Sequence, residues 1–252
     1  MNADLELAER AARAAGEVLL RYYGREPEGL DSKSSETDLV SDADREAERA
    51  IRELLEDERP QDGMLAEESS ESLGDSGRRW IVDPLDGTIN FLYGFPAWGV
   101  SIALEDRDGL AVGVVHSPVH RETFCAVRGE GARLDDRPLR VRENSQLSRA
   151  MVSTGFSYES ARRAEQAEVM SRLLPRARDI RRAGAAALDL AWVAAGRVDA
   201  FYERGLKAWD LAAGQLLVEE AGGVVLALEG MPPGVIAAAS QELLDDLAEL
   251  VA

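Results

Sequence analysis

Asp83 and Asp86 stand on either side of a proline-led turn in the hexapeptide D-P-L-D-G-T. Their carboxylates, with the Leu85 carbonyl between them, are hard oxygen ligands that suit Mg²⁺. Gly87 and Thr88 follow where a helix is expected to begin, and free N–H groups at a helix start favour a phosphate. The hexapeptide therefore predicts metal and phosphate binding in one loop. A simple proline turn ending in an N-cap aspartate is the alternative.

Two other segments could add carboxylates to this loop. Glu67 lies upstream in the string A-E-E-S, and Asp210 lies downstream at the start of an expected helix in A-W-D. Taken alone, a Glu-Glu pair is usually a solvated surface, and Asp210 alone would be read as a helix cap. Glu67 and Asp210 become candidate metal ligands only when they are considered together with the loop around Asp83.

Taken together, the segments resemble the inositol monophosphatase family. The string W-I-V-D-P-L-D-G-T-I-N-F is similar to that family's main signature, and W-D-L-A-A-G is similar to its C-terminal signature. Further family-like segments are K-S-S-E-T-D-L-V-S-D-A-D, the T-G-F at residues 154–156 and F-Y-E-R-G-L-K-A-W-D. The resemblance covers the chain from about Leu5 to the C-terminal helix.

The resemblance implies roles for particular residues. Metal binding falls to Glu67, Asp83, Asp86, Asp210 and the Leu85 carbonyl, and the resemblance implies two or three Mg²⁺ ions. Catalysis involves Asp44, Thr88 and Glu67, which orient the attacking water. Substrate binding involves Asp86, Gly87, Thr88, Gly184, Ala186 and Glu203. Lys33 matches a loop lysine near a third metal.

The implied reaction is hydrolysis of a phosphate monoester by in-line attack of water. No nucleophilic Ser, Cys or His motif indicates a covalent intermediate. One metal between Glu67 and Asp83 would activate water, and a second, held by three aspartates, would neutralise the leaving alkoxide. Two departures from the family pattern are Ala66, where many relatives have glycine, and Ala185, where some have a hydroxyl residue. The second leaves the substrate open.

Individual roles also have simpler explanations. Asp44 could serve only as the partner of Ser41 in a capping box. Lys33 could be a solvated loop lysine, and Glu203 a surface charge at a strand end.

The elements that must position these residues fall into two parts. In residues 1–143, apolar spacing predicts an amphipathic helix from Leu5 to about Gly24 and a second helix beginning at Ser41 and ending before Pro60. A short buried strand at residues 80–82 is expected to stop at Pro84, before a short helix up to Gly94. Two strands and a hairpin follow. This part is predicted to be α+β, with a sheet between helix layers.

Residues 144–252 alternate between strands and helices and are predicted to be α/β. The strands are expected at A-M-V-S-T-G-F, V-D-A-F-Y-E, G-V-V-L-A-L and G-V-I-A-A-A. The helices are expected at A-E-Q-A-E-V-M-S-R-L-L-P-R-A, A-A-L-D-L-A-W-V-A-A-G, W-D-L-A-A-G-Q-L-L-V-E-E-A-G and the C-terminal segment. The resemblance implies a layered αβαβα sandwich of the sugar-phosphatase type.

Composition excludes several functions. The net charge of −18 argues against binding to nucleic acid or anionic lipid, and it repels anionic substrates unless bound metal supplies a local positive charge. Lys33 and Lys207 are the only lysines. No signal peptide or membrane span is expected, and the single cysteine is compatible with the cytoplasm.

The leading functional prediction is an inositol-1-phosphate phosphatase that is lithium-sensitive, cytoplasmic and, by resemblance, a homodimer. Its substrate is expected to be a small phosphorylated polyol or sugar. Alternative substrates for the same chemistry are fructose-1,6-bisphosphate, histidinol phosphate, NADP and 3′-phosphoadenosine phosphates. Nucleotides would favour an aromatic or basic patch near the pocket, and the sequence alone identifies none. A non-enzymatic alternative is a regulatory partner of the transcription machinery.

Overall fold

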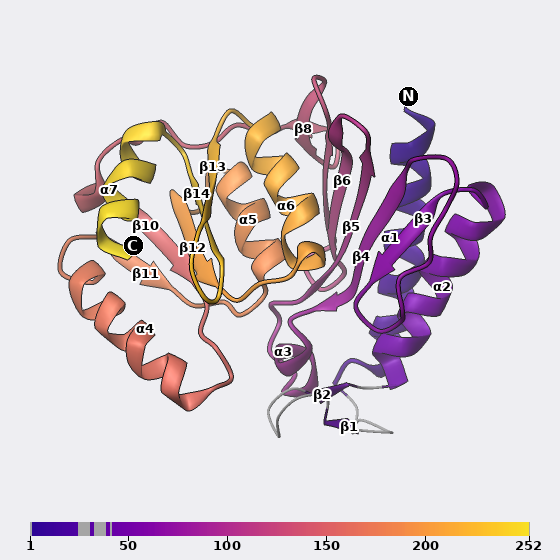
Figure 1. The fold of residues 1–252 in the computed structure, drawn as a ribbon, viewed down its shortest axis with the longest axis horizontal. Coiled ribbons are helices and arrows are strands. Elements are labelled where there is room, and N and C mark those ends of the chain that lie inside the picture. Colours follow the sequence, from indigo (N-terminus) through magenta and orange to yellow (C-terminus); the bar gives the residue numbers. More distant parts are fainter. Residues whose placement is uncertain (1, 25–30, 33–38, 41, 252) are drawn as a thin grey trace.

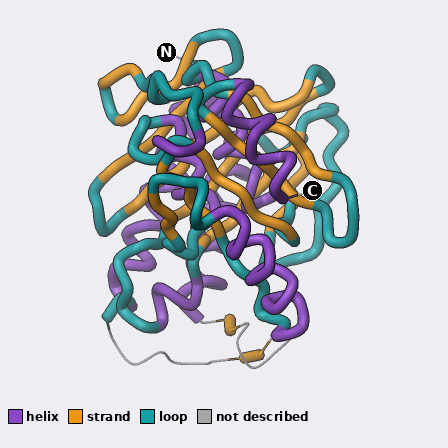
Figure 2. Tube along the Cα trace, turned by 90° about the vertical axis from the view of Figure 1, so that its left-hand side faces the viewer, coloured by secondary structure: helices purple, strands orange, loops and turns teal. Residues whose placement is uncertain are grey.

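The computed structural model describes residues 2–24, 31–32, 39–40 and 42–251, and in this part of the chain helices and sheets alternate in layers (Figure 1). Helices α1 and α2 cover one face of a seven-stranded sheet. Helices α5 and α6 lie between that sheet and a five-stranded sheet, whose far side carries α4 and α7. Figure 2 looks onto this far side of the molecule. The predicted αβαβα sandwich is confirmed.

The larger sheet has the strand order β3-β4-β5-β6-β7-β8-β9. β3 is parallel to β4, and every other neighbouring pair is antiparallel. Its strands are β3 (Gly63–Ala66), β4 (Arg79–Asp86), β5 (Gly99–Asp106), β6 (Gly109–Ser117), β7 (Glu122–Val127), β8 (Gly131–Leu134) and β9 (Arg137–Pro138).

The smaller sheet has the order β11-β10-β12-β14-β13. β10 is parallel to both β11 and β12, whereas β14 is antiparallel to β12 and β13. Its strands are β10 (Met151–Thr154), β11 (Asp179–Arg181), β12 (Ala200–Arg204), β13 (Val224–Leu228) and β14 (Gly234–Ala238). A two-residue pair, β1 (Asp31–Ser32) and β2 (Leu39–Val40), lies apart from both sheets.

Most helices follow the predicted apolar spacing, but the helix expected at residues 164–177 lies at Ser160–Leu173 and ends before Pro175. In α1 the buried residues include Leu5, Ala8 and Leu19, and the Asn2 side chain caps the helix by accepting from two N–H groups. Ser41, the predicted cap of the second helix, lies outside the described residues. The helices are α1 (Ala3–Tyr22), α2 (Asp42–Glu58), α3 (Thr88–Leu92), the 3₁₀ turn η1 (Leu147–Arg149), α4 (Ser160–Leu173), α5 (Ala186–Ala194), α6 (Ala208–Glu220) and α7 (Gln241–Val251).

The prediction that the strand at residues 80–82 stops at Pro84 is wrong. β4 continues to Asp86, because Asp83 still pairs with Ser101 and Asp86 pairs with Gly99. The register shifts between the two aspartates, which is where Pro84 lacks an N–H for the ladder. This irregularity lets both aspartates belong to one strand end without following strict alternation.

The apolar core fills the spaces between the layers. One cluster joins α1 and α2 to the larger sheet, a second joins that sheet to α5 and α6, and a third lies under α7. Gly214 of α6 lies directly against Leu190 of α5, where an added Cβ would come within 2.5 Å of the leucine Cβ. Close packing therefore fixes the two helices whose first turns face the acidic residues. Among the described helices, none is long and apolar enough to cross a membrane.

Candidate metal and substrate site

The strand end of β4 brings the hexapeptide aspartates into a fixed arrangement. The Leu85 N–H donates to Asp83 Oδ1 at 2.9 Å, so the turn backbone orients this carboxylate. The Thr88 hydroxyl donates to the Leu85 carbonyl at 3.1 Å and ties the turn to α3. Gly87 adopts φ +90°, and an added Cβ would lie 2.9 Å from the Ala97 carbonyl oxygen. Glycine is therefore required here by conformation and by space.

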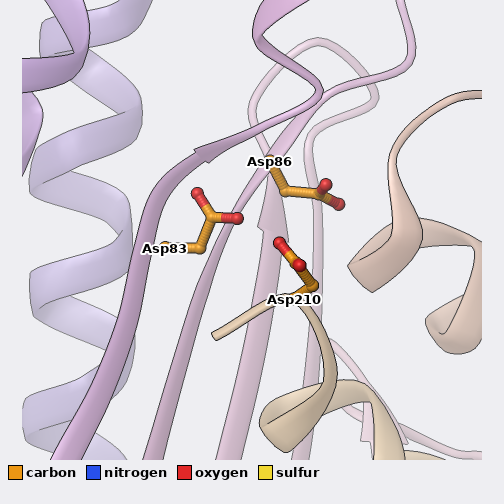
Figure 3. Close-up of side chains that lie close together, drawn as sticks. All are labelled: Asp83, Asp86 and Asp210. Atoms are coloured by element: carbon orange, nitrogen blue, oxygen red, sulfur yellow. The ribbon is translucent and has the colours of Figure 1, made fainter. Parts of the chain in front are cut away.

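Asp210 enters the same space from the first turn of α6. Its Oδ2 accepts the Lys207 N–H at 2.6 Å, so this residue is both a helix cap and an inward-facing carboxylate. Asp83, Asp86 and Asp210 each offer an oxygen such that these atoms all lie within 4.8 Å of one another (Figure 3). Three acidic side chains from two distant segments thus converge, as the sequence predicts.

Asp86 is held by a third segment. Its two carboxylate oxygens accept the N–H groups of Ala186 and Ala187 at 3.1 and 2.8 Å. Ala185, the residue at the N-cap position of α5, has no side chain that could cap the helix. Asp86 therefore caps α5 across the interface, and the start of this helix becomes part of the site.

The pKa of each of the three carboxyl groups is raised. Burial is the main cause for each, and for Asp83 the charges of Glu67, Asp86, Asp210 and Asp44 add to it. Asp86 has its pKa raised well above the usual range by burial and by Asp210, and burial raises the pKa of Asp210 to about 6. No ion pair with Lys or Arg neutralises these three aspartates within the described residues. Buried hard oxygen donors without a cation fit a divalent metal.

Glu67 and Asp44 lie next to the three aspartates. Glu67 follows β3 and lines the same cavity, although it does not belong to the group within 4.8 Å. Asp44, in the first turn of α2, is fully buried. The predicted catalytic roles of Glu67, Asp44 and Thr88 remain predictions, and Lys33 lies outside the described residues.

A cavity of about 490 Å³ opens beside the aspartates. The predicted substrate residues Gly87, Thr88, Gly184, Ala186 and Glu203 all line it. Burial raises the pKa of Glu203 to about 8, and the charges of Asp189, Asp210 and Asp86 contribute. A carboxyl group with such a pKa is protonated near neutral pH and can donate as well as accept a hydrogen bond.

The structure places aromatic and basic residues at the pocket, which the sequence alone does not identify. Phe156, Tyr158, Trp209 and Arg182 all line the cavity. Phe156 belongs to the T-G-F string and Trp209 to the W-D-L-A-A-G signature, whereas no quoted motif contains Tyr158 or Arg182. Asp189, which no sequence motif pointed to, is a buried acid whose Oδ1 has no hydrogen-bond partner among the described residues. Its single charge within the apolar string A-A-L-D-L-A-W could have drawn attention to it.

Two sheets separated by a layer of helices, with a cluster of buried carboxylates beside a cavity, are the arrangement of the layered α/β metal-dependent phosphatases. Residues 2–252 match the model of the inositol monophosphatase family, and the chain belongs to this family. The family resemblance from which the site residues were predicted is therefore confirmed for this chain.

Known relatives match almost the whole chain. A Pasteurella multocida protein named Nus factor SuhB is 42% identical over 98% of this chain and 95% of its own length. A Rhizobium meliloti protein named inositol-1-monophosphatase is also 42% identical, over 99% of this chain and 96% of its own length. The crystal structure of extragenic suppressor protein SuhB from Bartonella henselae has a TM-score of 0.93 at 41% identity, covering 99% of this chain and 98% of that one.

Proposed function

We propose that this protein is a Mg²⁺-dependent phosphomonoesterase whose main substrate is inositol-1-phosphate. The observation that carries the proposal is the convergence of Asp83, Asp86 and Asp210 within 4.8 Å at the edge of a cavity that also contains Glu203. The three aspartates suit a metal ion, which in turn binds the phosphate. Glu203 suits a hydrogen bond to a hydroxyl of the leaving group. The family and the relative named inositol-1-monophosphatase support the same assignment.

Asp83, Asp86, Asp210, Glu67 and the Leu85 carbonyl are the groups that would hold Mg²⁺. When bound, Mg²⁺ supplies charge neutralisation and a lower pKa for coordinated water. The backbone N–H groups of Gly87 and Thr88 donate to no protein acceptor among the described residues, which leaves them for phosphate oxygens. Asp44 and Thr88, with Glu67, would orient the attacking water, and in-line displacement then depends mainly on positioning.

A panel of phosphate esters tests this proposal. Phosphate release with Mg²⁺ would be measured for inositol-1-phosphate, fructose-1,6-bisphosphate, histidinol phosphate, NADP and 3′-phosphoadenosine phosphates. We expect the highest kcat/KM for inositol-1-phosphate, and no turnover of any ester would refute the proposal. The nucleotides belong in the panel because Phe156, Tyr158 and Arg182 line the cavity and could contact a base or a second phosphate.

We further propose that the enzyme is a cytoplasmic homodimer inhibited by lithium, as the family resemblance implies. Size-exclusion chromatography with light scattering measures the oligomeric state. Turnover that is unaffected by millimolar lithium would argue against the lithium-sensitive branch of the family.

A regulatory role is the second candidate, because several close relatives are named Nus factor. The net charge of −18 favours a protein partner over direct contact with RNA. Pull-down of transcription proteins with wild type and with Asp83→Asn separates the two functions. A scaffold role should survive the loss of the metal site, whereas phosphatase activity should not.

A further inference from the structure

Gly155 lies beside Glu203 because of the register of two parallel strands. β10 pairs with β12 through Val152 with Ala200, Ser153 with Phe201 and Thr154 with Tyr202. One step further along this register, Gly155 comes opposite Glu203. The Thr154 hydroxyl donates to the Tyr202 carbonyl at 2.7 Å and fixes the two strand ends. Both Gly155 and Glu203 line the cavity next to the aspartates.

The Glu203 carboxyl group occupies the space that a side chain at position 155 would need. The three atoms nearest to an added Cβ at Gly155 are Oε2, Cδ and Oε1 of Glu203. All three would lie closer than 3.0 Å, a separation that real Cβ atoms essentially never show. The carboxyl group therefore packs directly on the bare Cα of the glycine, and its position depends on the absence of a side chain there.

The backbone of Gly155 gives no other reason for glycine. Its φ lies outside the left-handed region that favours glycine, so an L residue is permitted by conformation. In contrast, Gly87 and Gly184 have φ values of +90° and +89°. The contact with Glu203 is thus the distinctive constraint at position 155.

We propose that Gly155 is a positioning residue for substrate selectivity, because it leaves room for the Glu203 carboxyl group to reach a hydroxyl of a polyol leaving group. This inference rests on the proposed phosphatase function and on the substrate role of Glu203. It specifies the substrate class as phosphate esters that carry a hydroxyl near the ester. A side chain at position 155 would displace the end of the Glu203 side chain and weaken that recognition.

A methyl group at position 155 should move Glu203 rather than the backbone. The carboxyl group is the far end of a flexible side chain, whereas the backbone is held by strand pairing on both sides of β12. Gly155→Ala is therefore expected to act like a partial removal of Glu203. Loss of one hydrogen bond to a buried polar group changes selectivity by about tenfold or more.

The experiment measures selectivity as the ratio of kcat/KM for inositol-1-phosphate to kcat/KM for p-nitrophenyl phosphate, with Mg²⁺. The second ester carries no hydroxyl beside its phosphate. The proteins are wild type, Gly155→Ala, Glu203→Ala and the double variant. We expect Gly155→Ala to lower the ratio at least about tenfold. In the Glu203→Ala background, the same substitution should lower it no further.

Several outcomes would overturn the inference. An unchanged ratio in Gly155→Ala would do so, and so would equal losses on both esters or effects that add fully in the double variant. If Gly155→Ala fails to fold, the double variant decides: normal folding there supports the steric contact, and failure there refutes it. A wild type inactive on both esters would instead refute the proposed phosphatase function.

Discussion

At the scale of single residues, the three aspartates are oriented by backbone donors rather than by cationic side chains. Leu85 donates to Asp83, Ala186 and Ala187 donate to Asp86, and Lys207 donates through its backbone to Asp210. N–H donors fix the direction of a carboxylate without neutralising its charge. The charge of these carboxylates is therefore left to be neutralised by a divalent cation.

Replacing Asp83 or Asp210 by asparagine should remove activity and leave the fold intact. An asparagine oxygen can still accept the backbone N–H, but the charge that holds the metal is lost. We expect kcat/KM to fall at least about 100-fold. Mg²⁺-dependent phosphate release measures activity, and circular dichroism checks folding.

Asp136→Asn serves as the matched control, because Asp136 is an exposed aspartate near the turn between β8 and β9. It should keep wild-type activity. An Asp83→Asn enzyme that turns over substrate at the wild-type rate would contradict the metal assignment.

At the scale of helices and strands, α1 packs on β6 through a buried histidine. His116 lies against Gly16, where an added Cβ would come within 2.8 Å of the ring, and its Nδ1 contacts Thr123 Oγ1 at 3.0 Å. Burial, and then the charge of Arg13, lower the pKa of His116 to about 4. The α1 interface therefore contains a neutral histidine at physiological pH.

This histidine should make the protein less stable in mild acid. The pKa in the unfolded chain is about 6.5, so between that pH and about 4 the unfolded state binds more protons. The stability contributed by neutral His116 is thus complete above about pH 6.5 and falls as pH decreases, by about 3 kcal/mol in total. Urea unfolding of wild type and of His116→Gln from pH 4 to 7 measures this contribution as a difference, in which the titration of the site carboxyls cancels.

His116→Gln keeps a hydrogen-bonding side chain and should remove the part of the pH dependence in which stability falls towards pH 4. His120→Gln is the matched control, since His120 is exposed, and it should retain the wild-type slope. If the slope of His116→Gln equals that of wild type, the buried histidine is not the source of acid sensitivity.

Most helices and strands could be predicted from the sequence because the apolar spacing that identifies each one lies within its own residues. The helices at residues 3–22 and 186–194 and the strand at 151–154 are examples. β3 and β11 were missed: they are short, and their pairing partners, not their own residues, make them strands. β4 was shortened because proline was read as a stop, whereas a register shift accommodates it.

Site residues that belong to sequence motifs could be predicted, whereas site contacts between distant segments could not. The signatures around Asp83 and Asp210 predicted that these aspartates converge with Asp86, whereas Glu67 lies outside the group within 4.8 Å. The hydrogen bonds from Ala186 and Ala187 to Asp86 join segments about a hundred residues apart, and no local pattern reveals them. The same holds for Arg182 and Tyr158, which come to the cavity only through the packing of the layers.

At the scale of the whole molecule, the two predicted parts share a core. α5 and α6, from residues 144–252, cover one face of the larger sheet, which belongs to residues 1–143. The division at residue 143 remains a prediction about the sequence, but the site needs both parts. Asp83 and Asp86 come from the first, and Asp210 and the N-terminus of α5 come from the second.

Because the acidic cluster lies at this junction, metal binding should stabilise the whole molecule. The folded pKa of Asp210, about 6, lies above its unfolded value, and those of Asp83 and Asp86 are also raised. For acids with raised pKa values, stability is complete below the unfolded pKa, about 4, and decreases as pH rises through the folded pKa. The contribution of these three acids to the stability of the metal-free protein should therefore decrease between about pH 4 and pH 7, opposite in sign to that of His116, and bound Mg²⁺ should reverse this loss.

Thermal unfolding at pH 7.5 with EDTA or with Mg²⁺ tests this coupling between metal and fold. A ligand at about 100 times its Kd adds about 2.7 kcal/mol, which for a chain of this size raises Tm by roughly 5–10 °C. Asp83→Asn should have a higher Tm than wild type in EDTA, because it removes one of the repelling charges, and should lose most of the response to Mg²⁺. Asp136→Asn should respond as wild type does. A wild-type Tm that does not change with Mg²⁺ would mean that the converging carboxylates do not form a cation site, because binding to the folded state alone must raise its stability.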